Sequence, residues 1–214
     1  MAHKVKSKNE LSIILEKEVP EIPEPSFKLE QYTTPGDLAS LIAWDLQYRV
    51  NLVDARILDL GAGTCRLSAA VALLGASYVI AAEYDPKLLE ICRETLSRLR
   101  LIDRVQLVRA WIRKDLGLFK AIDVVISNPP FGIARRGADR EFLEYSLNIG
   151  PRILYFILKS GNLEFHKKIA ENHGYSTFLL SRYRFPIKAS MMKHRSRIRR
   201  VDVDVIVFVK ETRE

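Results

Sequence analysis

The sequence predicts an α/β fold in which a mostly parallel sheet carries helices on both faces. Short apolar runs alternate with segments of helical periodicity over residues 56–172, and this order builds parallel strands joined by crossover helices. Two β-rich runs then follow with no helix between them, which indicates an antiparallel pair at the end of the sheet. The 214 residues are 48% hydrophobic and 28% charged, a composition that excludes disordered and collagen-like chains.

Periodicity and capping signals give the individual elements. The expected strands are 56–60, 78–83, 105–108, 124–127 and 153–157, followed by the terminal pair 175–183 and 201–209. The expected helices are 66–74, 86–98, 139–148 and 162–172. Gly75 and Gly174 are placed as C-terminal caps.

An N-terminal arm is predicted for residues 1–27, ahead of a single domain at 28–214. Three prolines interrupt the arm, and a short helix is expected over 11–17. Thr34-Pro35-Gly36-Asp37 then predicts a helix start, with the threonine as the cap, the proline in the first helical position and the aspartate near the positive end of the helix dipole. That helix is expected to run from 35 to 50.

The net charge of +8 lies formally in one stretch of the chain. There are 34 Lys and Arg against 26 Asp and Glu, and residues 182–200 hold eight basic residues and no acidic one. Without them the chain is balanced, at 26 against 26. We predict that this stretch is a loop between the last two strands and that it binds phosphates, which favours a nucleic-acid partner. The plain alternative is a solvated loop in a basic protein.

Cysteine content and the lack of long apolar runs bear on location. Cys65 and Cys92 are too few for a zinc site of thiolates and give no disulfide framework. No metal site is therefore expected, and a reducing compartment is the simplest interpretation. No apolar run has the length of a signal-peptide core or of a bilayer span. The sequence thus predicts a cytoplasmic, soluble protein with no membrane contact.

A glycine turn, Asp59-Leu60-Gly61-Ala62-Gly63-Thr64, lies where the first strand passes into the first crossover helix, the place where open α/β sheets bind ligands. A dinucleotide fingerprint needs a third glycine at position 66, but Arg66 would crowd a pyrophosphate there, which disfavours NAD and FAD. Glu83, about twenty residues further on, can accept hydrogen bonds from two ribose hydroxyls. This combination indicates a nucleoside ligand such as S-adenosylmethionine, with Asp59 near its amino acid end. The alternative is a tight turn and an unrelated surface acid.

The tetrapeptide Asn128-Pro129-Pro130-Phe131 follows the apolar run 124–126, the fourth expected strand. Its asparagine side-chain oxygen and the carbonyl of Pro129 can both accept from one amino group, and the ring of Phe131 offers a face to a planar base. Rate would come from positioning, since attack by the nitrogen creates a cation whose proton is already acidic. Asp123 is left in a structural role. The alternative is a proline-rich turn with Phe131 in the core.

This order of motifs resembles the class I S-adenosylmethionine-dependent methyltransferases with an Asn-Pro-Pro-aromatic motif, and more narrowly the methyltransferase-like protein five family with its archaeal relatives. The matching segments, from about residue 28 to 209, are Leu29-Glu30-Gln31-Tyr32-Thr33-Thr34-Pro35, Asp59-Leu60-Gly61-Ala62-Gly63, Asn128-Pro129-Pro130-Phe131-Gly132, Ala138-Asp139 with Phe142-Leu143, and Lys193-His194-Arg195. The resemblance implies a Rossmann-like fold with a mostly parallel seven-stranded sheet. It also implies N6-methylation of an adenosine in small-subunit ribosomal RNA.

The resemblance also assigns roles to single residues. Gln31 and Thr34 would line the cofactor pocket, and Tyr32 would lie near the target base. One departure concerns the end of the third strand, where the family usually has an aspartate that holds the adenine amine and this chain has Trp111. We expect Trp111 to stack on the adenine or to wall it off. In the glycine turn, Thr64 and Arg66 also replace residues that are smaller or apolar in the family.

An adenine in folded RNA has to leave its stack before the tetrapeptide can reach it, and contacts to the RNA backbone have to supply a few kcal/mol. Arg135 and Arg136 follow the tetrapeptide and are expected to hold phosphates that flank the extruded nucleotide. Lys193, His194 and Arg195 are expected to do so from the far side. The predicted partner is therefore RNA, in ribosomal RNA or the small ribosomal subunit.

Three rival functions stay open on the sequence alone. Methylation of a protein glutamine uses a similar planar amide, but those enzymes usually have Tyr after the prolines and a separate N-terminal helical domain. DNA adenine methylation usually requires a sizeable target-recognition region. A non-catalytic RNA-binding scaffold with the same fold is left open by the altered Trp111 position. The resemblance also raises a small zinc-binding methyltransferase activator as a partner, although no surface in the sequence identifies its contact.

Overall fold

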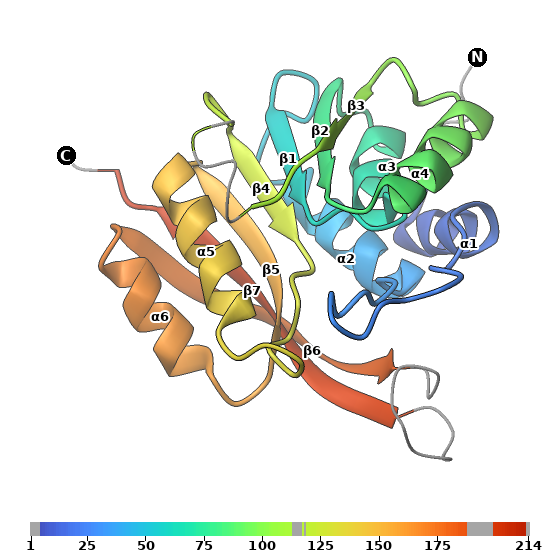
Figure 1. The fold of residues 1–214 in the computed structure, drawn as a ribbon. Coiled ribbons are helices and arrows are strands. Elements are labelled where there is room, and N and C mark those ends of the chain that lie inside the picture. Colours follow the sequence, from blue (N-terminus) through green and yellow to red (C-terminus); the bar gives the residue numbers. More distant parts are fainter. Residues whose placement is uncertain (1–4, 113–116, 118, 188–198, 213–214) are drawn as a thin grey trace.

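The computed structural model describes residues 5–112, 117, 119–187 and 199–212, and its centre is one seven-stranded sheet (Figure 1). The strands are β1 (Arg56–Leu60), β2 (Tyr78–Glu83), β3 (Val105–Arg109), β4 (Val124–Ser127), β5 (Ile153–Lys159), β6 (Tyr175–Ile187) and β7 (Arg199–Lys210). Their order is β3-β2-β1-β4-β5-β7-β6. β1 to β5 are parallel, and β7 runs antiparallel to both β5 and β6. The predicted fold class is confirmed.

Helices cover both faces of this sheet (Figure 1). They are α1 (Lys8–Glu18), α2 (Gly36–Leu46), α3 (Arg66–Leu73), α4 (Pro86–Arg98), α5 (Ala138–Ile149) and α6 (Leu163–Glu171). Because side chains alternate along a strand, β1 contributes Ile57 to one apolar cluster, with α1 to α4, and Leu58 to a second cluster, with α5 and α6. The sheet is therefore buried on both faces, which explains its continuous apolar strands.

Most predicted elements are confirmed with shifts of a few residues, but the start of α2 differs. Thr34 does not cap this helix: Pro35 is the cap residue, and it makes no side-chain capping bond. The Glu16 carboxylate of α1 accepts instead from the Gly36 N–H. The helix also ends at Leu46 rather than at position 50. The threonine hydroxyl is thereby left for another contact, which lies in the candidate site.

The N-terminal arm is packed on the core, and α1 is longer than predicted. Leu15 of α1 is fully buried. Arg66, only 4% exposed, donates to the backbone carbonyls of Val19 and Thr34 and pairs with Glu16. The expectation that Arg66 would crowd a ligand at the glycine turn is therefore wrong. Its guanidinium points toward the arm, where it satisfies backbone acceptors that would otherwise be buried without donors.

The basic stretch is a loop only in part, because β6 and β7 extend into it. Four of its eight basic residues lie on these strands: Arg182, Arg184, Arg199 and Arg200. Arg182 pairs with Asp204 at 3.3 Å and Arg184 pairs with Asp202 at 3.6 Å, as the register of the hairpin dictates. The prediction that residues 182–200 form a loop is therefore wrong at both ends of the stretch, and its role in phosphate binding stays a prediction. Two acids just beyond the counted stretch offset two of its charges.

The two cysteines are joined. A disulfide links Cys65, at the start of α3, to Cys92 on α4, and both residues are fully buried. The expectation that the cysteines form no structural bond is wrong, so the inference of a reducing compartment loses its basis. In the described part of the chain, no helix is both long enough and apolar enough to cross a membrane.

Candidate active site

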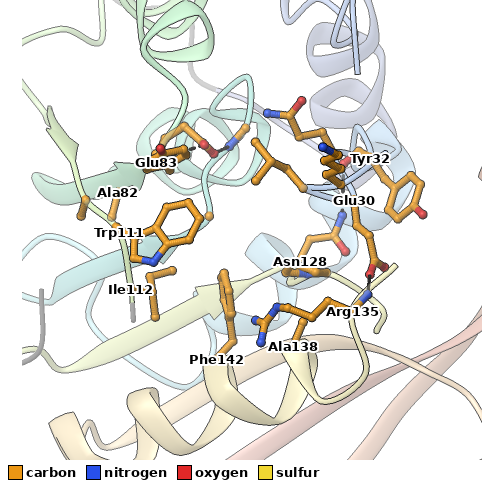
Figure 2. A pocket seen from close by; sticks show the side chains of 18 of the residues that line it. Glu30, Tyr32, Ala82, Glu83, Trp111, Ile112, Asn128, Arg135, Ala138 and Phe142 are labelled. Atoms are coloured by element: carbon orange, nitrogen blue, oxygen red, sulfur yellow. Dashed lines mark hydrogen bonds between the residues drawn. The ribbon is translucent and has the colours of Figure 1, made fainter. Parts of the chain in front are cut away.

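A cavity of about 400 Å³ lies at the carboxyl ends of the parallel strands, within the size range of small-molecule sites. Its wall combines the glycine turn after β1, the end of β2, the residues after β3, the tetrapeptide after β4 and the N-terminal segment 28–32. In the view of Figure 2, Glu83 and Trp111 lie at one end, and Glu30 and Arg135 lie at the other. Asn128 is between them.

The glycine turn has the conformation that the sequence predicts. Gly61 and Gly63 adopt φ of +78° and +56°, and both line the cavity. A Cβ at Gly61 would lie 3.1 Å from the ring of Phe142, closer than side chains normally approach, so position 61 requires glycine for two reasons. The Gly63 N–H donates to the Glu83 carboxylate at 2.9 Å, which ties the turn to the end of β2.

Glu83 is held in the cavity wall by three backbone N–H groups. Besides Gly63, Tyr84 and Asp85 donate to its carboxylate at 2.7 and 2.9 Å. Burial raises the pKa of Glu83, and the three hydrogen bonds oppose that shift. A carboxylate has about four acceptor sites, so capacity is left for a ribose hydroxyl. The fixed orientation fits the role that the sequence predicts.

Aromatic and polar side chains surround Glu83. Trp111 lines the cavity and meets Tyr84 edge to face, with ring centroids 4.1 Å apart. Arg109 lies over the Tyr84 ring at 5.8 Å. The indole thus forms part of an apolar wall of the cavity, and its contact with an adenine stays a prediction. Gln31 also lines the cavity, and its amide is fixed because it accepts from the Ser26 N–H and donates to Asp85.

Three predicted cofactor residues lie elsewhere. Asp59 is fully buried and directs its carboxylate to the N–H and hydroxyl of Ser68, at 2.9 and 2.6 Å. Burial raises the pKa of Asp59 to about 7. Its side chain does not line the cavity. Thr34 and Thr64 line a second, smaller cavity beside it, which Asn128 also borders. Of the three, Thr34 bonds to the tetrapeptide, through its hydroxyl and the Asn128 amide.

Asn128 is oriented by the N-terminal segment. Its Nδ2 donates to the Thr34 hydroxyl at 3.0 Å and lies 3.5 Å from the Tyr32 carbonyl. A carbonyl can only accept, so the nitrogen has to face that side. Oδ1 is buried and has no hydrogen-bond partner among the described residues. Because a buried acceptor without a donor is costly, this oxygen is suited to receive a donor from a ligand.

Phe131 does not present an open face to the cavity, contrary to the prediction. Of Pro129, Pro130 and Phe131, only Pro130 lines the cavity. The Phe131 ring is 4% exposed and stacks on Tyr32, with centroids 5.2 Å apart and planes at 15°. Phe185 of β6 meets it edge-on at 5.3 Å. Tyr32 thus lies next to the tetrapeptide and occupies the ring face expected for the base, so its place near a target base stays a prediction.

The predicted RNA-binding residues are only partly described. Arg135 lines the cavity, and its guanidinium forms a two-fold pair with Glu141. Arg136 is exposed in the same loop. Lys193, His194 and Arg195 lie outside the described residues. Asp123 accepts from the Arg56 N–H at 2.9 Å, which is the structural role expected of it.

Sequence reasoning gave no role to several residues at the site, among them Glu30 and Phe142 in the cavity wall and Phe185 against Phe131. Glu30 is 4% exposed, lines the cavity and accepts from the N–H groups of Ala134 and Arg135. It lies in the Glu-Gln-Tyr segment, but only the two residues after it received roles. No local signal marks Phe185, because its partners come from distant segments.

The comparisons with known proteins agree with this geometry. A family model described as a methyltransferase domain matches residues 57–145. A crystal structure from Pyrococcus horikoshii, named as a candidate RNA methyltransferase, has a TM-score of 0.84 and 31% identity, and the match covers 96% of this chain and 98% of that one. The magnesium protoporphyrin IX methyltransferase of Synechocystis with bound S-adenosylmethionine has a TM-score of 0.62 at 15% identity, covering 81% and 78% of the two chains, and shows the fold alone.

Sequence relatives narrow the family. The Drosophila melanogaster rRNA N(6)-adenosine-methyltransferase Mettl5 is 31% identical over 185 residues, which cover 85% of this chain and 86% of the relative. The Danio rerio protein of the same name is 28% identical over 189 residues, covering 86% and 90%. An uncharacterized protein of Methanocaldococcus jannaschii is 32% identical over 194 residues, covering 87% and 86%. The chain therefore belongs to the Mettl5 family of rRNA N(6)-adenosine-methyltransferases.

Proposed function

We propose that this chain transfers a methyl group from S-adenosylmethionine to the N6 amine of an adenosine in ribosomal RNA, with the small-subunit RNA as the first substrate to test. One observation carries the proposal. Asn128 Oδ1 is a buried acceptor without a partner among the described residues, and its amide is oriented at the edge of a cavity that also holds the glycine turn and Glu83. The names of the relatives support the choice of RNA.

The residues present fit the cofactor. S-adenosylmethionine, when bound, supplies a methyl group on a sulfonium that an amine lone pair can attack. The positive φ of Gly61 and Gly63 brings backbone close to the cavity, and Glu83 offers its remaining acceptor capacity to the ribose. Trp111 provides an apolar wall for the adenine. Gln31, which is fixed by Ser26 and Asp85, borders the same space.

Asn128 positions the amine. Its Oδ1 accepts one N6 hydrogen. The Pro129 carbonyl, which the sequence offered for the other hydrogen, does not line the cavity in this structure, so the aim of the lone pair at the incoming methyl group rests on Oδ1. Transfer creates a cation whose proton is acidic, and no strong base is required. Tyr32 does not serve as one, because burial, with a smaller contribution from Glu30, raises its pKa to about 12. The phenol is therefore protonated at neutral pH.

A base can stack on Phe131 only after Tyr32 moves. Their ring centroids are 5.2 Å apart, whereas a base between two rings needs roughly 7 Å, since stacked atoms approach to about 3.5 Å on each side. Tyr32 therefore either separates from Phe131 to form the second face of a sandwich or yields its place. Arg135, Arg136, Lys193, His194 and Arg195 would hold the flanking phosphates. We also propose that a small zinc-binding activator protein binds this chain as a partner.

The test is transfer of radiolabelled methyl from S-adenosylmethionine to ribosomal RNA, ribosomal subunits, DNA and protein in parallel, followed by nucleoside analysis. Asn128→Ala should abolish transfer, and Asn148→Ala, an exposed asparagine on α5, should leave it unchanged. Label recovered as N6-methyladenosine in small-subunit RNA would support the proposal. Label confined to protein would refute it in favour of glutamine methylation, and the absence of label despite cofactor binding would point to a missing partner.

A further inference from the structure

Glu30 is a buried carboxylate that the proposed reaction leaves unexplained. It is 4% exposed and lines the cavity beside Asn128. Its backbone adopts φ of +49°, the left-handed region that non-glycine residues rarely occupy and that persists only where surrounding contacts impose it. A buried charge in a strained backbone position destabilises the fold unless its contacts compensate. Those contacts therefore indicate what the residue is for.

The contacts of Glu30 join the N-terminal segment to the loop 132–137, which follows the tetrapeptide. Oε1 accepts from the Ala134 N–H at 2.8 Å and from the Arg135 N–H at 3.3 Å. Bonds from N–H groups to a charged acceptor are stronger than neutral ones. Oε2 is buried and has no partner among the described residues. The described hydrogen bonds of this carboxylate therefore all come from the backbone of the loop 132–137.

Every second residue of the segment 30–34 contacts the tetrapeptide or the loop that follows it. Thr34 accepts from the Asn128 amide, Tyr32 stacks on Phe131, and Glu30 holds the loop beyond it. The segment 30–34 therefore runs along the tetrapeptide in the opposite direction and touches it at both ends. In Figure 2, Glu30 and Arg135 lie together on the side of the cavity away from Glu83.

We propose that Glu30 is a positioning residue for methyl transfer, which holds the loop 132–137 so that the substrate side of the cavity is set before RNA binds. This inference rests on the proposed function. The cofactor side does not depend on Glu30, since Glu83 is held by backbone groups of its own strand end and of the glycine turn. Loss of Glu30 should therefore affect turnover rather than cofactor affinity.

The experiment compares Glu30→Ala and Glu30→Gln with the wild-type chain at full length. Glu144→Ala is the matched control, because Glu144 is an acid on α5 that pairs only with exposed Arg140 in the described contacts. Native-state trypsin digestion reports the loop directly, since Arg135 and Arg136 lie within it, and cleavage after them is quantified by mass spectrometry. S-adenosylhomocysteine affinity, kcat and KM for RNA complete the measurements.

We expect Glu30→Ala to be cleaved after Arg135 or Arg136 about 10-fold faster, the factor that corresponds to one lost hydrogen bond. Its kcat should fall about 10-fold or more, with S-adenosylhomocysteine affinity within about 2-fold of wild type. Glu30→Gln should restore both the cleavage resistance and kcat, because its amide oxygen can still accept from the two N–H groups. Glu144→Ala should behave as wild type in every assay.

Two results would overturn the inference. One is wild-type cleavage and wild-type kcat in Glu30→Ala. The other is a Glu30→Gln variant with wild-type cleavage but the kcat of Glu30→Ala, which would mean that the carboxylate acts on the substrate itself and not through the loop. A wild-type chain that methylates no RNA would refute the proposed function, and the cleavage comparison would still decide whether Glu30 holds the loop.

Discussion

Asn128→Asp tests whether catalysis depends on the direction in which the Asn128 amide faces. The substitution keeps the shape of the side chain and the acceptor at Oδ1. It replaces the donor Nδ2, which makes the 3.0 Å bond to the Thr34 hydroxyl and faces the Tyr32 carbonyl at 3.5 Å, with a second acceptor. The threonine hydroxyl can rotate to donate, but the carbonyl cannot. Two acceptors then face each other in a buried place.

The expected loss follows from that one unfavourable contact. An unmade buried hydrogen bond costs about 1–3 kcal/mol, and each 1.4 kcal/mol in the barrier corresponds to about 10-fold in rate. We therefore expect kcat to fall roughly 10- to 100-fold at pH 8. Protonation of the introduced carboxyl restores a donor toward the carbonyl. The ratio of variant to wild-type kcat should therefore rise as the pH is lowered.

The assay is single-turnover methyl transfer to ribosomal RNA at a series of pH values, reported as the ratio of variant to wild type so that unrelated titrations cancel. S-adenosylhomocysteine binding checks that the variant is folded, and Asn148→Asp on the exposed surface of α5 controls for the added charge. A ratio near one at every pH would show that the orientation of Asn128 is unimportant. A low ratio that does not change with pH would equally refute the argument from the missing donor.

Three further predictions concern the cofactor side and the stability of the fold. Glu83→Gln should weaken S-adenosylhomocysteine binding by at least about 10-fold in calorimetry, because the NH₂ of the glutamine would face one of the three backbone N–H donors. The control is Glu90→Gln, at an exposed position on α4. Binding as tight as in this control would contradict the prediction. Burial raises the pKa of Asp59 from 3.8 to about 7, so the folded state keeps a proton that the unfolded state loses, and the free energy of unfolding falls as the pH rises through that window. Asp59→Asn should remove up to about 4 kcal/mol of this fall in urea unfolding between pH 4 and 8, and parallel pH profiles for the two proteins would rule it out. Reduction of the disulfide between Cys65 and Cys92, whose positions are 27 residues apart, should lower the free energy of unfolding by about 3 kcal/mol, which equal denaturation midpoints with and without dithiothreitol would disprove.

Local patterns in the sequence were sufficient for most strands of the sheet and for the glycine turn and Glu83 at the cavity, although not for the placement of Asp59, Thr34 and Thr64. β1, β2, β4 and α4 have the bounds that their apolar runs and caps predict. The glycine turn and Glu83 meet because β1 and β2 are neighbours in parallel register, with Leu60 opposite Ala82. The carboxyl ends of parallel strands necessarily share one edge, so a motif at each end is enough to place a site there.

Contacts between distant segments could not be predicted in the same way. Thr34 meets Asn128 across 94 positions, and Glu30 meets Ala134 across 104. Neither pair has a local signature, because what joins them is the path of the N-terminal segment across the strand ends. The ion pairs of the basic stretch, residues 182–200, could not be predicted for a related reason. Only the register of β6 against β7 reveals that Arg182 lies opposite Asp204.

The two halves of the site therefore differ in how they are built, and this difference decides how variants should behave. The proposed cofactor half is made by strand ends and a turn that are adjacent in the sheet, and its donors to Glu83 are backbone groups that substitution does not remove. The proposed substrate half depends on the side chains of Glu30, Tyr32 and Thr34, which reach the tetrapeptide or the loop after it through three hydrogen bonds and one ring contact. Substitutions of Glu30 or Tyr32 should accordingly reduce turnover while cofactor affinity is retained, whereas Gln31 of the same segment borders the proposed cofactor space.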